Sequence, residues 1–168
     1  FLYIAQPPLY RAKRGGSEVY LKDDAALQEY LFAAAIDEGA VFRSFSGEEI
    51  AGGDLRQLAE EARVVKGLLE RLAQHLPLAV LEQAAISAAL DPLLIADPEK
   101  ATATATSIAK RLDALEKPAH RGWQGAPLAN GGRGLAFART LRGVTERHVI
   151  DAAIIDSSEA RRLNGRAG

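Results

Sequence analysis

Two stretches of the sequence decide its fold class: DPEKATATATSIAKRLDALE at residues 97–116 and GLAFARTLRGVTERHVI at residues 134–150. In the first stretch, apolar side chains recur every three or four residues, which is the period of an α-helix. In the second, larger apolar residues alternate with small or polar ones around Arg142–Gly143, a pattern typical of a β-hairpin. Because the period changes after Lys117, we expect helices and antiparallel strands in separate parts of the chain.

The same two patterns extend to the rest of the chain. We expect helices over residues 24–38, 54–76, 78–90 and 157–163, in addition to the helix that follows Asp97. We expect strands over residues 1–6, 9–13, 19–21, 41–45 and 123–128, and a polar loop over 46–53. The predicted fold class is therefore α+β, with central helices and antiparallel strands or hairpins at both ends.

The longest expected helix, over residues 54–76, carries a continuous apolar stripe from Leu55 to Leu76. An amphipathic helix of this kind needs a packing partner. The expected partners are the alanine-rich helix over 78–90 and the helix after Asp97, whose Asp-Pro-Glu start supplies a carboxylate cap. One alternative for function is a protein-interaction module that presents the long helix 54–76 to a partner.

Length and composition exclude several classes of protein. A chain of 168 residues without cysteine is long enough for a core, but it has neither a disulfide framework nor a thiolate metal site. No apolar run approaches the roughly 20 residues that span a bilayer, so we expect no membrane partner and a cytoplasmic location. The sequence starts at Phe1, contains no methionine and shows no signal-peptide pattern, so we expect a piece of a longer protein.

The net charge of −1 hides an uneven distribution of charged residues. Residues 1–22 are basic, residues 23–116 hold 17 acidic and 8 basic side chains, and residues 117–147 are basic again. A polyanion would be attracted to the two basic flanks and repelled by the acidic middle.

No catalytic constellation emerges from the sequence. The glycine pairs at 15–16 and 131–132 lie between expected strands, so we interpret them as turns rather than phosphate-binding loops. The three histidines fall on a helix end, a loop and a strand without metal-ligand spacing. No serine lies in a nucleophile elbow, and Trp123 is interpreted as a core anchor. A free-standing enzyme is the weakest of the functional alternatives.

Two short runs resemble a known family. YIAQPPLYR at residues 3–11, followed by YLKDD at residues 20–24, is similar to the end of the TOPRIM region in the B subunits of bacterial DNA gyrases. That family continues quickly to a Tyr-Lys-Gly-Leu-Gly motif, which is missing from this sequence. The chain thus resembles the gyrase B subunits of Gram-negative bacteria, which carry an extra domain inserted at this point. Residues 149–155 and 159–163 look like the return from the insertion.

The resemblance implies three parts: a terminal strand and hairpin of the TOPRIM region over residues 1–22, an inserted α+β domain over 23–150, and a return segment over 151–168. It implies a parent isomerase that uses ATP and Mg²⁺ to introduce negative supercoils into DNA. In this family the metal-binding acids lie upstream of residue 1, the ATP site lies in a separate amino-terminal domain, and the DNA-cleaving tyrosine belongs to the A subunit. We therefore expect no cofactor, metal or catalytic residue in this fragment. Its expected partners are DNA, the gyrase A subunit, and the remainder of the B subunit.

DNA contact by this fragment would require exposed cations. The candidates are Arg11, Lys13, Arg14 and Lys22 near the first hairpin, and Arg139, Arg142 and Arg147 on the later strands. Contacts from such side chains to phosphates weaken with salt and carry little sequence information. The expected function is a non-catalytic accessory domain that assists DNA binding and contacts between domains or subunits.

Overall fold

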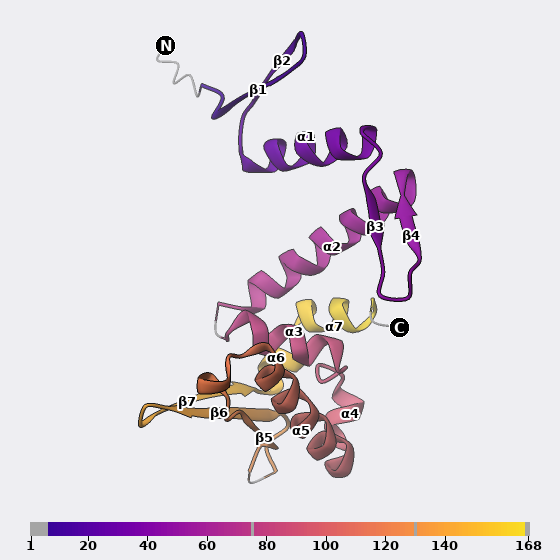
Figure 1. Ribbon diagram of the computed structural model, residues 1–168. Coiled ribbons are helices and arrows are strands. Elements are labelled where there is room, and N and C mark those ends of the chain that lie inside the picture. Colours follow the sequence, from indigo (N-terminus) through magenta and orange to yellow (C-terminus); the bar gives the residue numbers. More distant parts are fainter. Residues whose placement is uncertain (1–6, 75, 130, 167–168) are drawn as a thin grey trace, which may run out of the picture. The chain divides into compact units, whose positions relative to one another are not determined.

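The computed structural model describes residues 7–74, 76–129 and 131–166 (Figure 1). The chain divides into two compact units, Phe1–Ala62 and Arg63–Gly168. Helices and small antiparallel sheets both occur in the described residues, so the predicted α+β class is confirmed. The strand expected over residues 1–6 lies outside the described residues.

The first unit contains a β-hairpin near its start. Strands β1 (Tyr10–Arg14) and β2 (Ser17–Leu21) pair antiparallel around Gly15, whose φ of +58° suits the turn. The register pairs Tyr10 with Leu21, and both side chains lie on the less exposed face of the hairpin. The two strands that the sequence predicts here are confirmed.

Helix α1 (Asp24–Asp37) follows the hairpin. The Asp23 side chain caps it by accepting a hydrogen bond from the backbone N–H of Ala26 at 2.8 Å. The chain leaves the helix through Gly39, whose φ is +82°. The predicted helix is confirmed, but no α1 residue is buried, and Leu31 is 56% exposed.

A second hairpin lies where the sequence predicts a polar loop over residues 46–53. Strand β3 (Val41–Arg43) pairs antiparallel with β4 (Glu49–Ala51), and Arg43 forms an ion pair with Glu49 across the two strands. The loop prediction is wrong at β4. A three-residue strand is too short to show alternation, and its existence depends on pairing with β3.

Helix α2 (Gly52–Leu72) begins and ends earlier than the predicted bounds of 54–76. Three leucines in its last turns are buried, whereas Leu58 and Val64 are each 38% exposed. The apolar stripe therefore joins a core only at the carboxyl-terminal end of the helix.

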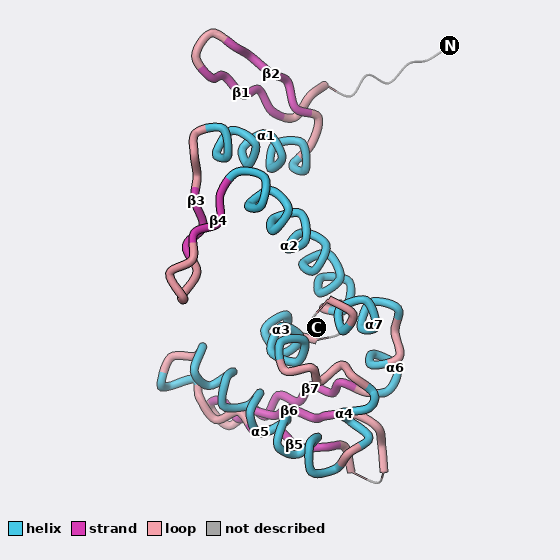
Figure 2. The backbone as a smooth tube through the Cα atoms, turned by 90° about the vertical axis from the view of Figure 1, so that its right-hand side faces the viewer, coloured by secondary structure: helices cyan, strands magenta, loops and turns pink. Residues whose placement is uncertain are grey.

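The second unit combines several helices with one sheet. After the end of α2, its helical elements are α3 (Leu78–Ile86), α4 (Pro92–Ala96), α5 (Pro98–Leu115), the 3₁₀ turn η1 (Pro118–His120), α6 (Ala152–Ile155) and α7 (Ser158–Asn164). Its strands are β5 (Gln124–Pro127), β6 (Leu135–Leu141) and β7 (Val144–Ile150), which form an antiparallel sheet in that order. Helix α5 lies along this sheet (Figure 2).

Two helix boundaries in this unit illustrate local rules. The Asp97 carboxylate caps α5 by accepting hydrogen bonds from the backbone N–H groups of Glu99 and Lys100, as the Asp-Pro-Glu start predicts. The helix predicted over 78–90 ends at Ile86, because Ala88 adopts a φ of +53° that an α-helix cannot contain.

The core of the second unit lies between α5 and the sheet. Ile108 of α5 and Phe137 of β6 are fully buried. Helix α5 approaches β5 so closely that a Cβ atom at Gly125 would lie 2.3 Å from the Ala105 carbonyl oxygen. Only glycine fits at this position of β5 without a shift of the helix.

Strand register divides the sheet into two faces. The inner face, toward α5, carries Leu135, Phe137, Arg139, Leu141, Val144, Glu146, His148 and Ile150. The outer face carries Gln124, Ala126, Ala136, Ala138, Thr140, Thr145, Arg147 and Val149. None of these outer-face residues is acidic.

Candidate nucleic-acid interface

The cations of the first hairpin are mostly matched by acids. The nearest N–O distances are 3.6 Å between Arg11 and Glu18, 2.7 Å between Arg14 and Glu38, and 3.8 Å between Lys22 and Asp23. Lys13 forms no ion pair among the described residues, although the strand register places it opposite Glu18. Four of the predicted contact residues are thus brought together near one hairpin, but three of them are already in ion pairs.

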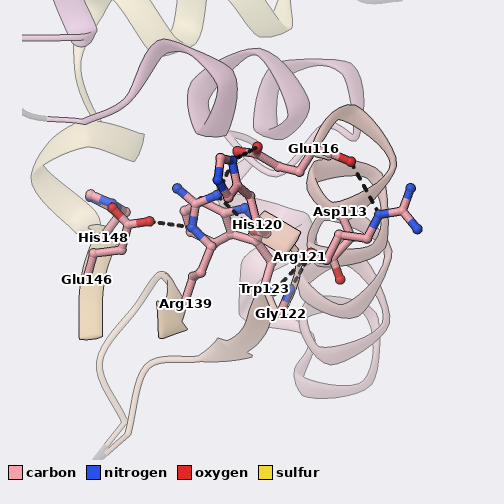
Figure 3. Close-up of polar contacts among 9 residues, drawn as sticks. All are labelled: Asp113, Glu116, His120, Arg121, Gly122, Trp123, Arg139, Glu146 and His148. Atoms are coloured by element: carbon pink, nitrogen blue, oxygen red, sulfur yellow. Dashed lines mark hydrogen bonds and ion pairs between the residues drawn. The ribbon is translucent and has the colours of Figure 1, made fainter. Parts of the chain in front are cut away.

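Arg139 occupies a different environment from the one that DNA contact requires. Its guanidinium carbon lies 4.5 Å from the centroid of the Trp123 ring (Figure 3). Its Nη1 donates to Glu116 at 2.7 Å and to the His120 carbonyl at 3.1 Å, and its Nε donates to Glu146. Burial tends to lower the pKa of Arg139, but hydrogen bonds to Glu146 and Glu116 outweigh it and raise the pKa. This guanidinium holds α5, the loop after it and the β6–β7 hairpin together.

The loop that places Trp123 beneath Arg139 is anchored by one carboxylate. Asp113, near the end of α5, accepts hydrogen bonds from the backbone N–H groups of Gly122 at 2.9 Å and Trp123 at 3.0 Å (Figure 3). The bond from Trp123 is the largest of the effects that lower the pKa of the Asp113 carboxyl. Trp123 is only 9% exposed, so the prediction of a core anchor is confirmed.

His148 belongs to the same cluster on the inner sheet face. Its ring centroid lies 5.9 Å from that of Trp123, and its Nε2 lies 3.6 Å from the Glu146 carboxylate. Among the described residues, no three His, Asp or Glu side chains converge closely enough to hold a metal ion. The sheet cluster therefore has the geometry of a packed ionic network.

Arg142 and Arg147 lie apart from this cluster. Arg147 projects from the outer sheet face opposite Ala138, whereas Arg139 lies on the inner face opposite Glu146. Arg142 lies in the turn between β6 and β7, with a φ of +50°. Both Arg142 and Arg147 are exposed, and neither has an acidic partner within the described residues. The three arginines that the sequence groups together are thus separated by the strand register.

Two further exposed cations escaped the sequence-based selection of contact residues. Lys117 and Arg121 flank η1, and Arg121 Nε donates to the Glu116 carbonyl at 3.3 Å. Both residues belong to the basic segment 117–147, so the charge distribution along the sequence could have identified them as candidate phosphate contacts. By contrast, Arg133 forms an ion pair with Asp156.

The described residues thus define an α+β module with an acid-free outer sheet face. A family model for the DNA gyrase B subunit insert domain matches residues 40–167, and one described as "GyrB, hook" matches residues 8–36. The chain belongs to the DNA gyrase B subunit family, as a segment that joins hook and insert. The resemblance inferred from residues 3–24 is confirmed.

Individual relatives agree with the family models. The DNA gyrase B subunit of Caulobacter vibrioides is 40% identical over 167 residues, which are 99% of this chain and 19% of that protein. The DNA gyrase B subunit of Rickettsia conorii is 29% identical over 163 residues, which are 95% of this chain and 19% of that protein. The type 2 topoisomerase B subunit of Aquifex aeolicus is 39% identical over 54 residues, covering 30% of this chain and 7% of that protein. The chain therefore spans about a fifth of the length of the two gyrase proteins.

No helix in the described residues combines the length and apolarity needed to cross a membrane.

Proposed function

We propose that this chain is a non-catalytic accessory part of a DNA gyrase B subunit that assists DNA binding by the enzyme. The parent would be a cytoplasmic type II topoisomerase that uses ATP and Mg²⁺ to introduce negative supercoils. We assign both cofactors to other parts of that enzyme. The partners of this segment would be duplex DNA, the gyrase A subunit, and the remainder of the B subunit.

The observation that carries this proposal is the pair of uncompensated cations on the β6–β7 hairpin. Arg142 and Arg147 are exposed without acidic partners in the described chain, and the outer face around Arg147 carries threonine hydroxyls and small side chains. Such a surface lets a phosphate backbone approach without like-charge repulsion, and the threonine O–H that is not donated to the other threonine adds a donor to phosphate oxygens. Arg139, whose side chain is only 13% exposed and is paired with two carboxylates, is left out of the proposed contact set.

The first hairpin makes a secondary contribution in this proposal. Glu18, Glu38 and Asp23 partly neutralise its cations. A phosphate contact by any of these cations would therefore release fewer counterions from DNA than a contact by an unpaired arginine. We therefore rank Arg11, Lys13, Arg14 and Lys22 below Arg142 and Arg147 as phosphate contacts.

A salt titration of the 168-residue chain with a labelled duplex tests the proposal. Each phosphate contact contributes roughly −0.9 to the slope of log K against log salt concentration. Replacing Arg142 and Arg147 by alanine should therefore make the slope shallower by about 1 to 2. Arg133→Ala is the matched control, because Asp156 already neutralises that arginine. Absence of binding at low salt, or an unchanged slope in the double variant, would overturn the proposal.

A protein-interaction role for the helix predicted over 54–76 is the second candidate, and one feature favours it. Glu48, Glu49, Asp54 and Glu61 line a cavity of about 320 Å³ together with Ile50, Gln57 and Leu58 at the start of α2. This acidic surface with the exposed side chain of Leu58 repels DNA but suits a basic, partly apolar protein segment. Calorimetric titration of the chain with the gyrase A subunit, or with the remainder of the B subunit, would test it. Leu58→Asp should remove the heat of binding, and heat unchanged by that variant would overturn this role.

The three-part division at residues 22/23 and 150/151 remains part of the proposal. Adding the chain to a supercoiling assay that lacks the B subunit should give no activity, because we propose that the catalytic groups lie elsewhere. ATP-dependent supercoiling in that mixture would contradict the non-catalytic assignment.

A further inference from the structure

The turn of the β6–β7 hairpin contains an amino acid that its backbone does not favour. Arg142 and Gly143 have φ values of +50° and +81°, so both central residues of this two-residue turn are left-handed. Turns of this type strongly prefer Asn, Asp or Gly, whose short or absent side chains tolerate that conformation. Arginine brings no local hydrogen bond that would explain its position, and the described residues contain no acidic partner for it. Such an outlier is a reason to look for a function.

The surroundings of Arg142 fit a protruding contact point. The tip of the hairpin extends beyond the helices of its own unit (Figure 1). Val144, next to the turn, is 71% exposed, and Leu141 lies opposite it on the same face. Behind them, the hydroxyls of Thr140 and Thr145 lie 2.8 Å apart and link the two strands. The tip therefore presents one cation between apolar side chains on a short braced ribbon.

We propose that this tip enters the minor groove of duplex DNA, with Arg142 between the strands and Val144 against the sugars of the groove wall. This inference rests on the DNA contact proposed above and adds which groove is bound and by which residue. A single arginine suits the minor groove, because a narrow A·T-rich groove concentrates negative potential and attracts one inserted guanidinium. Apolar side chains next to the groove are a recurring feature of proteins that bind there.

The major groove fits the tip less well. Direct readout in that groove uses several polar side chains that reach base edges. The tip residues from Leu141 to Val144 offer Arg142 alone. Arg147 cannot join it, because the register places Arg147 on the outer face and away from the turn, opposite Ala138.

Binding of the 168-residue chain to an A-tract duplex and to a G·C-rich duplex of equal length tests the inference. The wild-type chain should bind the A-tract duplex about fivefold more tightly than the G·C-rich duplex. This factor is the low end of the affinity loss that one mismatched base pair causes at a specific site. Arg142→Asn removes the cation but keeps a residue that suits the left-handed turn, so the fold should persist, which circular dichroism checks. This variant should bind both duplexes equally and more weakly. Netropsin, which occupies the minor groove, should displace the wild-type chain from the A-tract.

Arg147→Gln provides the matched control on the same hairpin. It should weaken binding to both duplexes by the same factor, because an outer-face arginine contacts phosphates without selecting sequence. A wild-type chain that binds both duplexes equally, or an Arg142→Asn variant that keeps the A-tract preference, overturns the minor-groove inference while leaving DNA contact intact. Absence of binding to either duplex overturns both proposals. Loss of calorimetric binding to the gyrase A subunit in Arg142→Asn, with DNA affinity unchanged, would assign the tip to a protein partner and also overturn the inference.

Discussion

At the scale of single residues, charged side chains in the second unit divide into those that hold the fold and those that face solvent. Asp113 and Arg139 are committed to partners inside the unit, whereas Arg142 and Arg147 are exposed. Sequence alone gives all these arginines similar weight. Their environments differ because strand register and the turn place one of them against Trp123.

Replacing Asp113 by alanine should destabilise the second unit. The two backbone N–H groups of Gly122 and Trp123 would lose a charged acceptor, at a cost of about 1 to 3 kcal/mol in the free energy of unfolding. Urea unfolding followed by fluorescence of Trp123, the only tryptophan, measures the change. Asp113→Asn keeps an acceptor oxygen and should lose less.

The same carboxylate predicts a pH dependence. Because folding lowers the pKa of Asp113 below its ordinary value of 3.8, its stabilising effect is fully present above pH 3.8 and is lost as pH falls through the folded pKa. The difference in unfolding free energy between the wild-type chain and Asp113→Ala should thus shrink at pH values below 3.8. A difference in unfolding free energy that stays constant from pH 7 to well below pH 3.8 would contradict this account.

Arg139→Met should also destabilise the second unit. It removes the guanidinium that Glu116 and Glu146 share, at a cost of about 1 to 3 kcal/mol. The emission of Trp123 should shift as well, since the guanidinium leaves the face of the indole ring. Arg133→Met breaks a more exposed ion pair with Asp156 and should cost less than about 1 kcal/mol. Equal effects from the two variants would contradict the assigned difference.

At the scale of elements, the close approach of the α5 backbone to strand β5 sets the position of this helix on the sheet. Local patterns predicted both elements, since their alternation and helical period are long and regular. They could not predict β4, which exists only as the partner of β3, or the early end of α3 near Ala88. Each of these depends on contacts or backbone angles that a short segment does not encode.

Two glycine-to-alanine substitutions should have opposite effects. At Gly125 the new Cβ atom would meet the Ala105 carbonyl oxygen at 2.3 Å, so α5 must shift, costing about 1 to 3 kcal/mol. At Gly67, within α2, the nearest atom is 3.9 Å away, so alanine should stabilise the helix by about 0.5 to 1 kcal/mol. Thermal unfolding of both variants gives the comparison, and destabilisation by both would refute the close-packing argument.

At the scale of the whole chain, the two units differ in how much apolar surface they bury. Leu21 is the one buried hydrophobic residue in the described part of Phe1–Ala62, whereas the second unit has a large core that includes Phe137 and Ile108. Hydrophobic burial is the main favourable contribution to folding. The first unit therefore buries little apolar surface that could stabilise α1.

Hydrogen exchange should separate the two units. Amide protons of α1 should exchange much faster than those of α5, because opening α1 exposes no buried side chain whereas opening α5 disrupts the core. Mass spectrometry of peptides from each helix measures the rates in the isolated chain. Addition of the gyrase A subunit, together with the remainder of the B subunit, should slow exchange in α1 if either covers it. Equal exchange in α1 and α5 without partners would contradict the difference.

The sequence by itself determined the α+β class, most element positions, the helix cap at Asp97, and the family of gyrase B subunits. These properties follow from periodicity, cap chemistry and a short matching run, all of which are local along the chain. Only the tertiary structure decided which cations are free, because Arg139 becomes paired through residues distant in sequence while Arg142 does not. It also decided how much of the apolar stripe on α2 is buried. Burial and ion pairing depend on which segments meet, and local patterns do not contain that information.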